Sequence, residues 1–197
     1  MAKVHVTTPI SEEQVREIKA GDEALITGTI YTARDAAHKR MVEDLAAGKG
    51  LPFDARGAVI YYVGPTPPKP GQVIGSAGPT TSYRMDKFTP EMLKNGVKAV
   101  IGKGYRGDEV KAAFVSEGGV YLVSTGGAGA LLARTIEGAE VVAYEDLGAE
   151  AVRRLTVKEF PTVCIHDAGG GDQYYAGQSK WVKPDAMVKP KKPEAGE

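Results

Sequence analysis

Short runs of β-branched and apolar residues alternate along the chain with segments in which apolar residues recur every three or four positions. The runs are typical of strands and the other segments of helices that bury one face. We expect strands at residues 24–31, 58–63, 97–101, 120–123, 141–143 and 162–165, and helices at 11–20, 33–48, 89–96, 131–133 and 149–154. The alternation predicts an α/β domain with a layered mixed sheet and flanking helices.

The ends of the predicted helices carry recognisable signals. Ser11 followed by Gln14 has the form of a capping box. Thr89 followed by Pro90 predicts a cap with proline in the first turn. The second helix has an apolar stripe that repeats every four residues and predicts its buried face, made of Ala37, Met41 and Leu45.

Two segments lack such patterns. A loop rich in proline and glycine runs from residue 65 to residue 86, and long loops in compact domains are often functional. From residue 183 to residue 197 prolines stand among lysines and glutamates. We therefore expect a domain of residues 1–182 and a flexible, charged C-terminal tail of residues 183–197.

Charge and composition narrow the function classes. The 25 Lys and Arg residues balance 25 Asp and Glu residues, which argues against a nucleic-acid-binding protein. A single cysteine, Cys164, excludes a disulfide framework, a cysteine-rich zinc site and an iron–sulfur cluster held by this chain's own cysteines. No apolar run has the length of a signal peptide core or a membrane helix, so we expect a cytoplasmic protein without membrane contact.

The first candidate site residues are Arg34 and His38. An arginine in the first turn of a helix opposes the helix dipole, so something has to offset it. Residues four apart share a helix face, so one ligand could meet both the guanidinium and the imidazole. The alternative is a surface arginine paired with Asp35 or another carboxylate, beside an exposed histidine.

The second candidate is the stretch from Gly75 to Arg84. The hydroxyls of Thr80 and Thr81 and the guanidinium of Arg84 suit an anion, because a guanidinium binds a carboxylate through two parallel hydrogen bonds. A capped turn before the next helix is the alternative.

The third candidate is Lys103, which lies between two glycines directly after a buried strand. Open α/β sheets commonly bind ligands just beyond strand ends, although a tight turn with a solvated lysine has the same pattern. The spacing of a Walker phosphate loop is absent.

Two further motifs are weaker. The loop at residues 126–129 lacks the last glycine of a dinucleotide fingerprint, so close backbone packing explains it better. His166, Asp167 and Asp172 in a glycine loop are weak evidence for a metal.

Taken together, three cations, two hydroxyls and one imidazole suit a small dicarboxylate better than an apolar ligand or a nucleotide. These segments resemble the beta subunit, or C-terminal domain, of the class I iron–sulfur hydro-lyases, which comprise class I fumarate hydratases and L-tartrate dehydratases. The Arg-Asp-x-x-His pattern at residues 34–38 and the Gly-Pro-Thr-Thr-x-x-Arg-Met pattern at residues 78–85 carry the resemblance, which runs from about residue 7 to residue 175.

The resemblance implies a swivelling β/β/α domain that closes over a four-iron four-sulfur cluster held by a separate alpha subunit, in an assembly of two alpha and two beta chains. It implies that Arg34, Thr81, Arg84 and Lys103 bind substrate and that His38 and Thr80 act in catalysis. We favour His38 as the group that titrates, since an imidazole exchanges protons near neutral pH.

The expected function is that of the beta subunit of a heteromeric fumarate hydratase, which hydrates fumarate to L-malate reversibly. An L-tartrate dehydratase beta subunit and a carboxylate-binding module without catalysis are the alternatives. Differences from the family pattern at Tyr83, Ala149 and residues 169–171 leave the substrate open.

Overall fold

Five parallel strands form the centre of the fold. In the computed structural model, which describes residues 2–182, these strands are β1 (Lys3–Thr7), β2 (Glu23–Thr32), β3 (Val59–Tyr61), β4 (Ala99–Gly102) and β5 (Val120–Val123). Each runs parallel to the next in that order. Because parallel strands point the same way, the loops that follow β2, β3, β4 and β5 all leave from the same edge.

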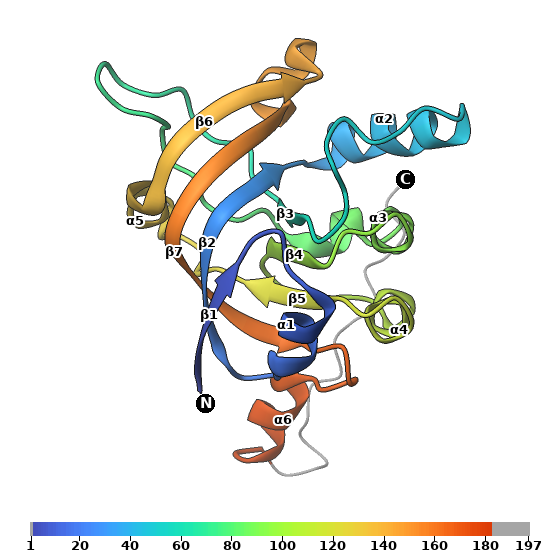
Figure 1. The fold of residues 1–197 in the computed structure, drawn as a ribbon. Coiled ribbons are helices and arrows are strands. Elements are labelled where there is room, and N and C mark those ends of the chain that lie inside the picture. The colour runs from blue at the N-terminus through green and yellow to red at the C-terminus, as the bar shows by residue number, and fades with distance from the viewer. Residues whose placement is uncertain (1, 183–197) are drawn as a thin grey trace.

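Two antiparallel strands complete the sheet. The long strand β7 (Val152–His166) pairs with β5 and also with β2, so β2, β3, β4, β5 and β7 form a closed ring. The strand β6 (Ile136–Ala143) pairs with the outer edge of β7. Figure 1 shows β6 and β7 curving along one side of the molecule and β1 beside the lower half of β2.

Helices cover the sheet mainly on one side. The α-helices are α1 (Glu12–Glu17), α2 (Asp35–Ala46), α3 (Thr89–Lys94), α4 (Asp108–Ser116), α5 (Gly129–Leu132) and α6 (Gln173–Ser179). Three short 3-10 helices are η1 (Ser82–Met85), η2 (Ala133–Thr135) and η3 (Glu145–Glu150). In Figure 1, α2, α3 and α4 lie on the side away from β6 and β7. The fold is therefore a mixed α/β fold with a sheet of seven strands.

Alternation along the strands produces two apolar cores. In β3, Val59 and Tyr61 belong to a core shared with β2 and β7, whereas Ile60 belongs to a second core that includes Met92 of α3 and Phe114 of α4. Successive side chains of a strand point to opposite faces, which explains the division. The second core fixes the helices against the sheet and so positions the loops at the strand ends.

Most predicted elements are confirmed, with shifted ends. The capping box of α1 forms as predicted, with both the Ser11 and the Gln14 hydrogen bonds present. The prediction that Thr89 caps α3 is wrong, because Phe88 occupies the cap position and the Thr89 hydroxyl donates to the carbonyl of Met85. The helices α4 and α6 and the strand β1 have no counterpart among the predicted elements.

The predicted helix at residues 149–154 is wrong. The chain there leaves η3 after Glu150 and enters β7 at Val152. The exposed charged residues of β7 break up its apolar runs, and Glu159 interrupts the strand with a positive φ of 49°. The sequence therefore predicted only the last apolar part of β7, at residues 162–165.

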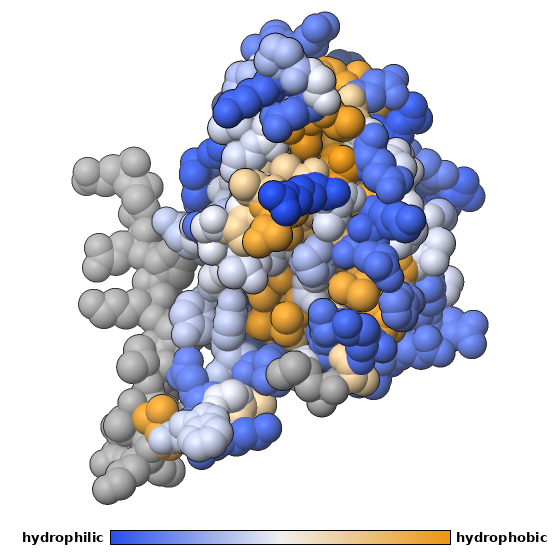
Figure 2. All heavy atoms as spheres, turned by 90° about the vertical axis from the view of Figure 1, so that its left-hand side faces the viewer, coloured by the Kyte–Doolittle hydropathy of each residue, from blue (hydrophilic) through white to orange (hydrophobic). Residues whose placement is uncertain are grey.

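The surface over β6 and β7 is mixed in character. Figure 2 shows apolar patches on this face among hydrophilic side chains. Leu131 of α5 and Val141 of β6 are exposed in spite of their apolar side chains. None of the helices within residues 2–182 is long and apolar enough to cross a membrane. The predicted tail of residues 183–197 lies outside the described residues.

Candidate functional site

The segment from Thr80 to Ser82 is bound to the end of β4 like a short extra strand. Thr81 and Lys103 form a parallel β-bridge. The backbone N–H of Lys103 donates to the carbonyl of Thr80 at 3.2 Å, and the N–H of Ser82 donates to the carbonyl of Lys103 at 2.9 Å. Thr80, Thr81 and Lys103, which the sequence predicted as site residues from two separate segments, are therefore brought together.

Buried hydroxyls hold this segment in place. The Tyr121 hydroxyl donates to the carbonyl oxygen of Gly104 at 2.7 Å and, having only one hydrogen, accepts from the Ser82 hydroxyl at 2.9 Å. A Cβ atom on Gly102 would lie 2.0 Å from the Ser82 oxygen, so only glycine leaves room for Ser82 there. The glycines on either side of Lys103 are visible in the sequence, but the contact between Gly102 and Ser82 is not.

A second group of charges lies where β2 meets α2. Nε of Arg84, in η1, is 2.9 Å from Oδ1 of Asp35, the first residue of α2. Nη2 of Arg34 is 3.8 Å from Oδ2 of the same carboxylate and 3.3 Å from Oε1 of Glu150. Two predicted site residues, Arg34 and Arg84, thus share one carboxylate.

Glu150 offsets the unfavourable position of Arg34 at the start of α2. Arg34 occupies the cap position of this helix, and its own side chain forms no capping hydrogen bond. The carboxylate of Glu150 accepts from the backbone N–H of Ala36 at 2.9 Å instead. A negative group stabilises the N-terminus of a helix, so Glu150 acts there in place of a capping side chain. The pairing of Arg34 with neighbouring carboxylates agrees with the alternative stated for it above.

His38 does not share a ligand-facing surface with Arg34, so this part of the expectation is wrong. The side chain is fully buried and packs against the rings of Tyr62 and Phe88. Nδ1 lies 2.9 Å from the carbonyl oxygen of Arg34, which can only accept, so Nδ1 carries the proton. Burial lowers the pKa of His38 to about 4, so the imidazole is neutral near pH 7.

The reason for this difference lies at the start of α2. Residues four apart share a face only when both are helical, and Arg34 has an extended backbone with φ −119° and ψ −160°. Its side chain therefore departs from the helix, while the buried His38 packs against Tyr62 of the second core. The guanidinium of Arg34 lies against Gly64, whose Cβ would be 2.9 Å from Nη1.

Lys103 has space in which its ammonium can meet a ligand. Its side chain passes Gly126, where an added Cβ would lie 3.5 Å from Cδ and 3.8 Å from Nζ of Lys103. Within residues 2–182, no carboxylate forms an ion pair with Lys103. Lys103 thus differs from Arg34 and Arg84, whose charges are already partly matched.

A buried arginine that the sequence analysis missed supports the same loop. Arg106 pairs with Asp86 at 2.6 Å and donates to the hydroxyl of Thr89 at 2.7 Å. Its guanidinium also lies over the ring of Tyr62. The N–H of Gly107 donates to the second oxygen of Asp86, so the end of η1 is tied to the loop after β4. No local pattern in the sequence marks Arg106 and Gly107 as partners of Asp86.

The two weaker motifs have structural explanations. A Cβ on Gly129 would lie 2.8 Å from the backbone nitrogen of Gly78, which confirms close backbone packing. Asp172 binds the ammonium of Lys111 at 2.9 Å. Asp167 accepts hydrogen bonds from backbone N–H groups, including that of Ala20 at 2.9 Å. Both carboxylates of the predicted metal motif are therefore occupied by partners within the chain.

Cys164 does not fit the role of a cluster ligand in this fold. The side chain is fully buried in the first core, and burial raises the pKa of its thiol. Among residues 2–182, His, Cys, Asp and Glu side chains form no group of three that could hold a metal ion. The described residues therefore do not suit a resident iron–sulfur cluster.

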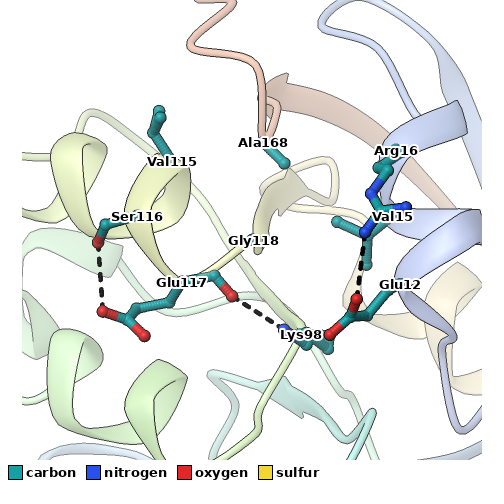
Figure 3. A pocket seen from close by; sticks show the side chains of 9 residues that line it. All are labelled: Glu12, Val15, Arg16, Lys98, Val115, Ser116, Glu117, Gly118 and Ala168. Atoms are coloured by element: carbon teal, nitrogen blue, oxygen red, sulfur yellow. Dashed lines mark hydrogen bonds and ion pairs between the residues drawn. The ribbon is translucent and has the colours of Figure 1, made fainter.

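A pocket of about 320 Å³ lies at the opposite edge of the sheet. Figure 3 shows its lining, which comes from α1, α4 and the loops before β4, before β5 and after β7. Arg16 pairs with Glu12 at 3.2 Å, and Lys98 donates to the carbonyl of Glu117 at 2.9 Å. None of the site residues predicted from the sequence lines this pocket, so we place the candidate site at the strand ends that carry Arg34 and Lys103.

Comparisons with known proteins show the family of the chain. Residues 1–177 match the family model for the fumarase C-terminus. The chain is 44% identical over 149 residues to "Fumarate hydratase 1, mitochondrial" of Leishmania major, covering 75% of this chain and 27% of that protein. It is 37% identical over 174 residues to "Fumarate hydratase class I, anaerobic" of Escherichia coli, covering 86% and 32%. The chain thus spans less than a third of these two fumarate hydratases.

A relative of similar length also matches. The chain is 37% identical over 171 residues to "Putative L(+)-tartrate dehydratase subunit beta" of Methanocaldococcus jannaschii. The match covers 84% of this chain and 88% of that protein. By the family model and by these relatives, which carry hydro-lyase names, the chain belongs to the fumarase C-terminus family.

Proposed function

We propose that this chain is the substrate-binding half of a class I hydro-lyase, the beta subunit of a fumarate hydratase that adds water reversibly to fumarate. One observation carries the proposal: Arg34, Arg84 and Lys103, from three separate segments, lie in the loops at one edge of the sheet together with two threonine hydroxyls. Family membership supplies the class of reaction.

The three cations suit the two carboxylates of a small substrate. Arg34 and Arg84 meet at Asp35, so they would bind one carboxylate, and Lys103 with Thr81 would bind the other. Hydrogen bonds between charged groups are worth about 1.5 to 3 kcal/mol each, so these contacts together can select a dianion over a neutral analogue.

The Thr80 hydroxyl is the group of this chain that we place beside the reacting carbons. Its backbone is held on both sides, by the carbonyl of Tyr62 and the N–H of Lys103. Within residues 2–182, no imidazole or carboxylate hydrogen-bonds to the Thr80 hydroxyl. A threonine hydroxyl needs a base before it can accept a substrate proton, so we assign that base to the partner chain.

His38 remains a candidate for proton transfer only if it becomes exposed. In this structure its pKa of about 4 and its full burial separate it from substrate and solvent. We infer that His38 holds the backbone of Arg34 through its Nδ1–H group, which keeps the guanidinium at the site.

The iron–sulfur cluster belongs to the partner in this proposal. Class I enzymes use a four-iron four-sulfur cluster as a Lewis acid, and the buried Cys164 supports its assignment to an alpha chain. We further propose that the domain swivels over that partner, in an assembly of two alpha and two beta chains in the cytoplasm.

A second candidate substrate has support from one comparison. The relative named as a tartrate dehydratase subunit beta matches along 88% of its length, whereas the fumarate hydratases are much longer than this chain. Tartrate is also a dicarboxylate, so the same three cations suit it. A carboxylate-binding module without catalysis is the third possibility, and family membership argues against it.

An anaerobic assay of the chain reconstituted with a cluster-carrying alpha chain tests the proposal. Fumarate, malate and both tartrates are offered separately. We expect the highest kcat/KM with fumarate and malate. Preference for L-tartrate would move the assignment to the tartrate dehydratases, and inactivity with all four would contradict the hydro-lyase proposal.

A further inference from the structure

We propose that Asp35 is a positioning residue, whose carboxylate orients Arg84 and Arg34 for a substrate carboxylate. The inference rests on the proposed function, in which these arginines bind substrate. It adds a residue that would not touch substrate itself but would determine how well the two arginines bind it.

The contact joins two elements that are far apart in the sequence. Asp35 begins α2, and Arg84 lies in η1 after the long loop. Oδ1 of Asp35 is 2.9 Å from Nε of Arg84, and Oδ2 is 3.8 Å from Nη2 of Arg34. One carboxylate therefore faces both guanidinium groups.

The geometry leaves the far end of Arg84 free. Asp35 takes the Nε side of the guanidinium, and no hydrogen bond to the Nη atoms of Arg84 occurs within residues 2–182. A carboxylate binds a guanidinium best through two parallel N–H groups, and the two terminal nitrogens offer such a pair. Asp35 would thus orient Arg84 with its binding edge open.

The Asp35 carboxylate and the Arg34 guanidinium are partly buried, whereas Arg84 is more exposed. The Asp35 side chain is 31% exposed and that of Arg34 is 23% exposed. Nε of Arg34 and Oδ2 of Asp35 are both buried without a hydrogen-bond partner. Among residues 2–182, Asp35 is the one carboxylate that pairs with Arg84, whose side chain is 44% exposed, so the orientation of Arg84 depends on Asp35.

A carboxylate beside a binding site for anions could instead act as a competitor. In that case it would repel the substrate or occupy the arginines, and its neutralisation would strengthen substrate binding. Positioning predicts the opposite sign, because the loss of the pair frees Arg84 to sample other orientations. The sign of the change in KM therefore separates the two roles.

The test compares Asp35→Asn, Asp35→Glu and Asp146→Asn in the reconstituted complex. Asp146 is a matched control, because it pairs with Arg40 of α2 through two hydrogen bonds of 2.7 Å and contacts neither site arginine. For Asp35→Asn we expect KM for fumarate to rise about fivefold, with a smaller change in kcat. Asp35→Glu should stay nearer the wild-type KM, and Asp146→Asn should match it. An unchanged or lower KM in Asp35→Asn would overturn the proposal.

A second readout does not need the partner. The Nε–H resonance of Arg84 in the ¹⁵N-labelled chain reports its contact with the Asp35 carboxylate. In Asp35→Asn this resonance should shift, and the Nε hydrogen should exchange faster with water. In Asp146→Asn neither should change. If the wild-type complex proves inactive with every substrate, the proposed function fails. A loss of the Arg84 signal in Asp35→Asn would still support the positioning contact, and an unchanged signal would refute it.

Discussion

The carbonyl oxygen of Arg34 accepts from Nδ1 of His38 across 2.9 Å, and it also accepts from the backbone N–H of His38 at 2.9 Å. The imidazole is therefore part of the helix start and not part of the exposed surface. It connects the buried second core to the residue that presents the first guanidinium of the site.

The first prediction concerns stability in acid. Burial lowers the pKa values of His38 and His166 from 6.5 to about 4. Between pH 6.5 and pH 4 the unfolded chain takes up protons that the folded chain does not, so the free energy of unfolding falls as the pH falls. Each histidine lowers the free energy of unfolding by about 3 kcal/mol as the pH falls across that range. Urea unfolding at a series of pH values measures the slope.

The His38→Asn variant is the control for this slope. It should be less stable at pH 7 but lose less stability than the wild type between pH 6.5 and pH 4, because one of the two titrating groups is gone. An identical pH slope in both proteins would show that His38 is not held neutral in the folded chain.

The second prediction separates His38 from proton transfer. If the imidazole only holds Arg34, the His38→Asn complex should keep the wild-type shape of the dependence of kcat on pH while its KM rises. Steady-state kinetics from pH 5.5 to pH 9 measure both. The loss of one limb of the pH profile, with KM unchanged, would restore His38 as an acid or base.

The third prediction concerns Arg84. Replacement by alanine should raise KM for fumarate at least tenfold, since a charge-assisted pair with a carboxylate is worth about 1.5 to 3 kcal/mol. The absorbance of the cluster in the complex should stay unchanged, which shows that the assembly is intact. Arg56→Ala is the matched control, because Arg56 is an exposed arginine that pairs with the nearby Asp54. Equal kinetics in Arg84→Ala and Arg56→Ala would remove Arg84 from the site.

The fourth prediction tests the close contact beneath the site. In Gly102→Ala the added methyl group would lie 2.0 Å from the Ser82 oxygen and 3.0 Å from the Tyr62 ring, so the Thr80 segment has to move. We expect a destabilisation of about 1 to 3 kcal/mol, typical of overpacking, and a marked loss of kcat/KM. Thermal unfolding and the fumarate assay measure the two effects.

Gly50→Ala provides the comparison for that change. An added Cβ at Gly50 meets nothing within 4 Å, so stability and activity should stay close to those of the wild type. If Gly102→Ala behaves like Gly50→Ala, the contact between Ser82 and Gly102 does not constrain the site.

How far the site can be predicted from sequence depends on the range of the contacts. Lys103 follows a strand recognisable from its apolar run, and parallel strand ends share an edge, so its position at that edge follows from local patterns. The predicted strands and the capping box of Ser11 are local in the same sense, and the structure confirms them.

Contacts between distant segments could not be predicted. Glu150 meets Arg34 and Ala36 only because β7 pairs with β2 and returns η3 to the start of α2. The prediction that His38 shares a helix face with Arg34 is wrong because the four-residue spacing does not apply to Arg34, which lies before the helix. Arg106 has an ordinary loop sequence, and its burial follows from the packing of α3 and α4.

The most direct test of the central claim is turnover of fumarate by this chain, by the alpha chain and by the two reconstituted together without oxygen. We expect each chain alone to be inactive, the isolated chain of residues 1–197 to be colourless, and the pair to form malate. Robust hydration by the isolated chain would contradict the division of the site between two chains, and an inactive pair with an intact cluster would contradict the proposed function.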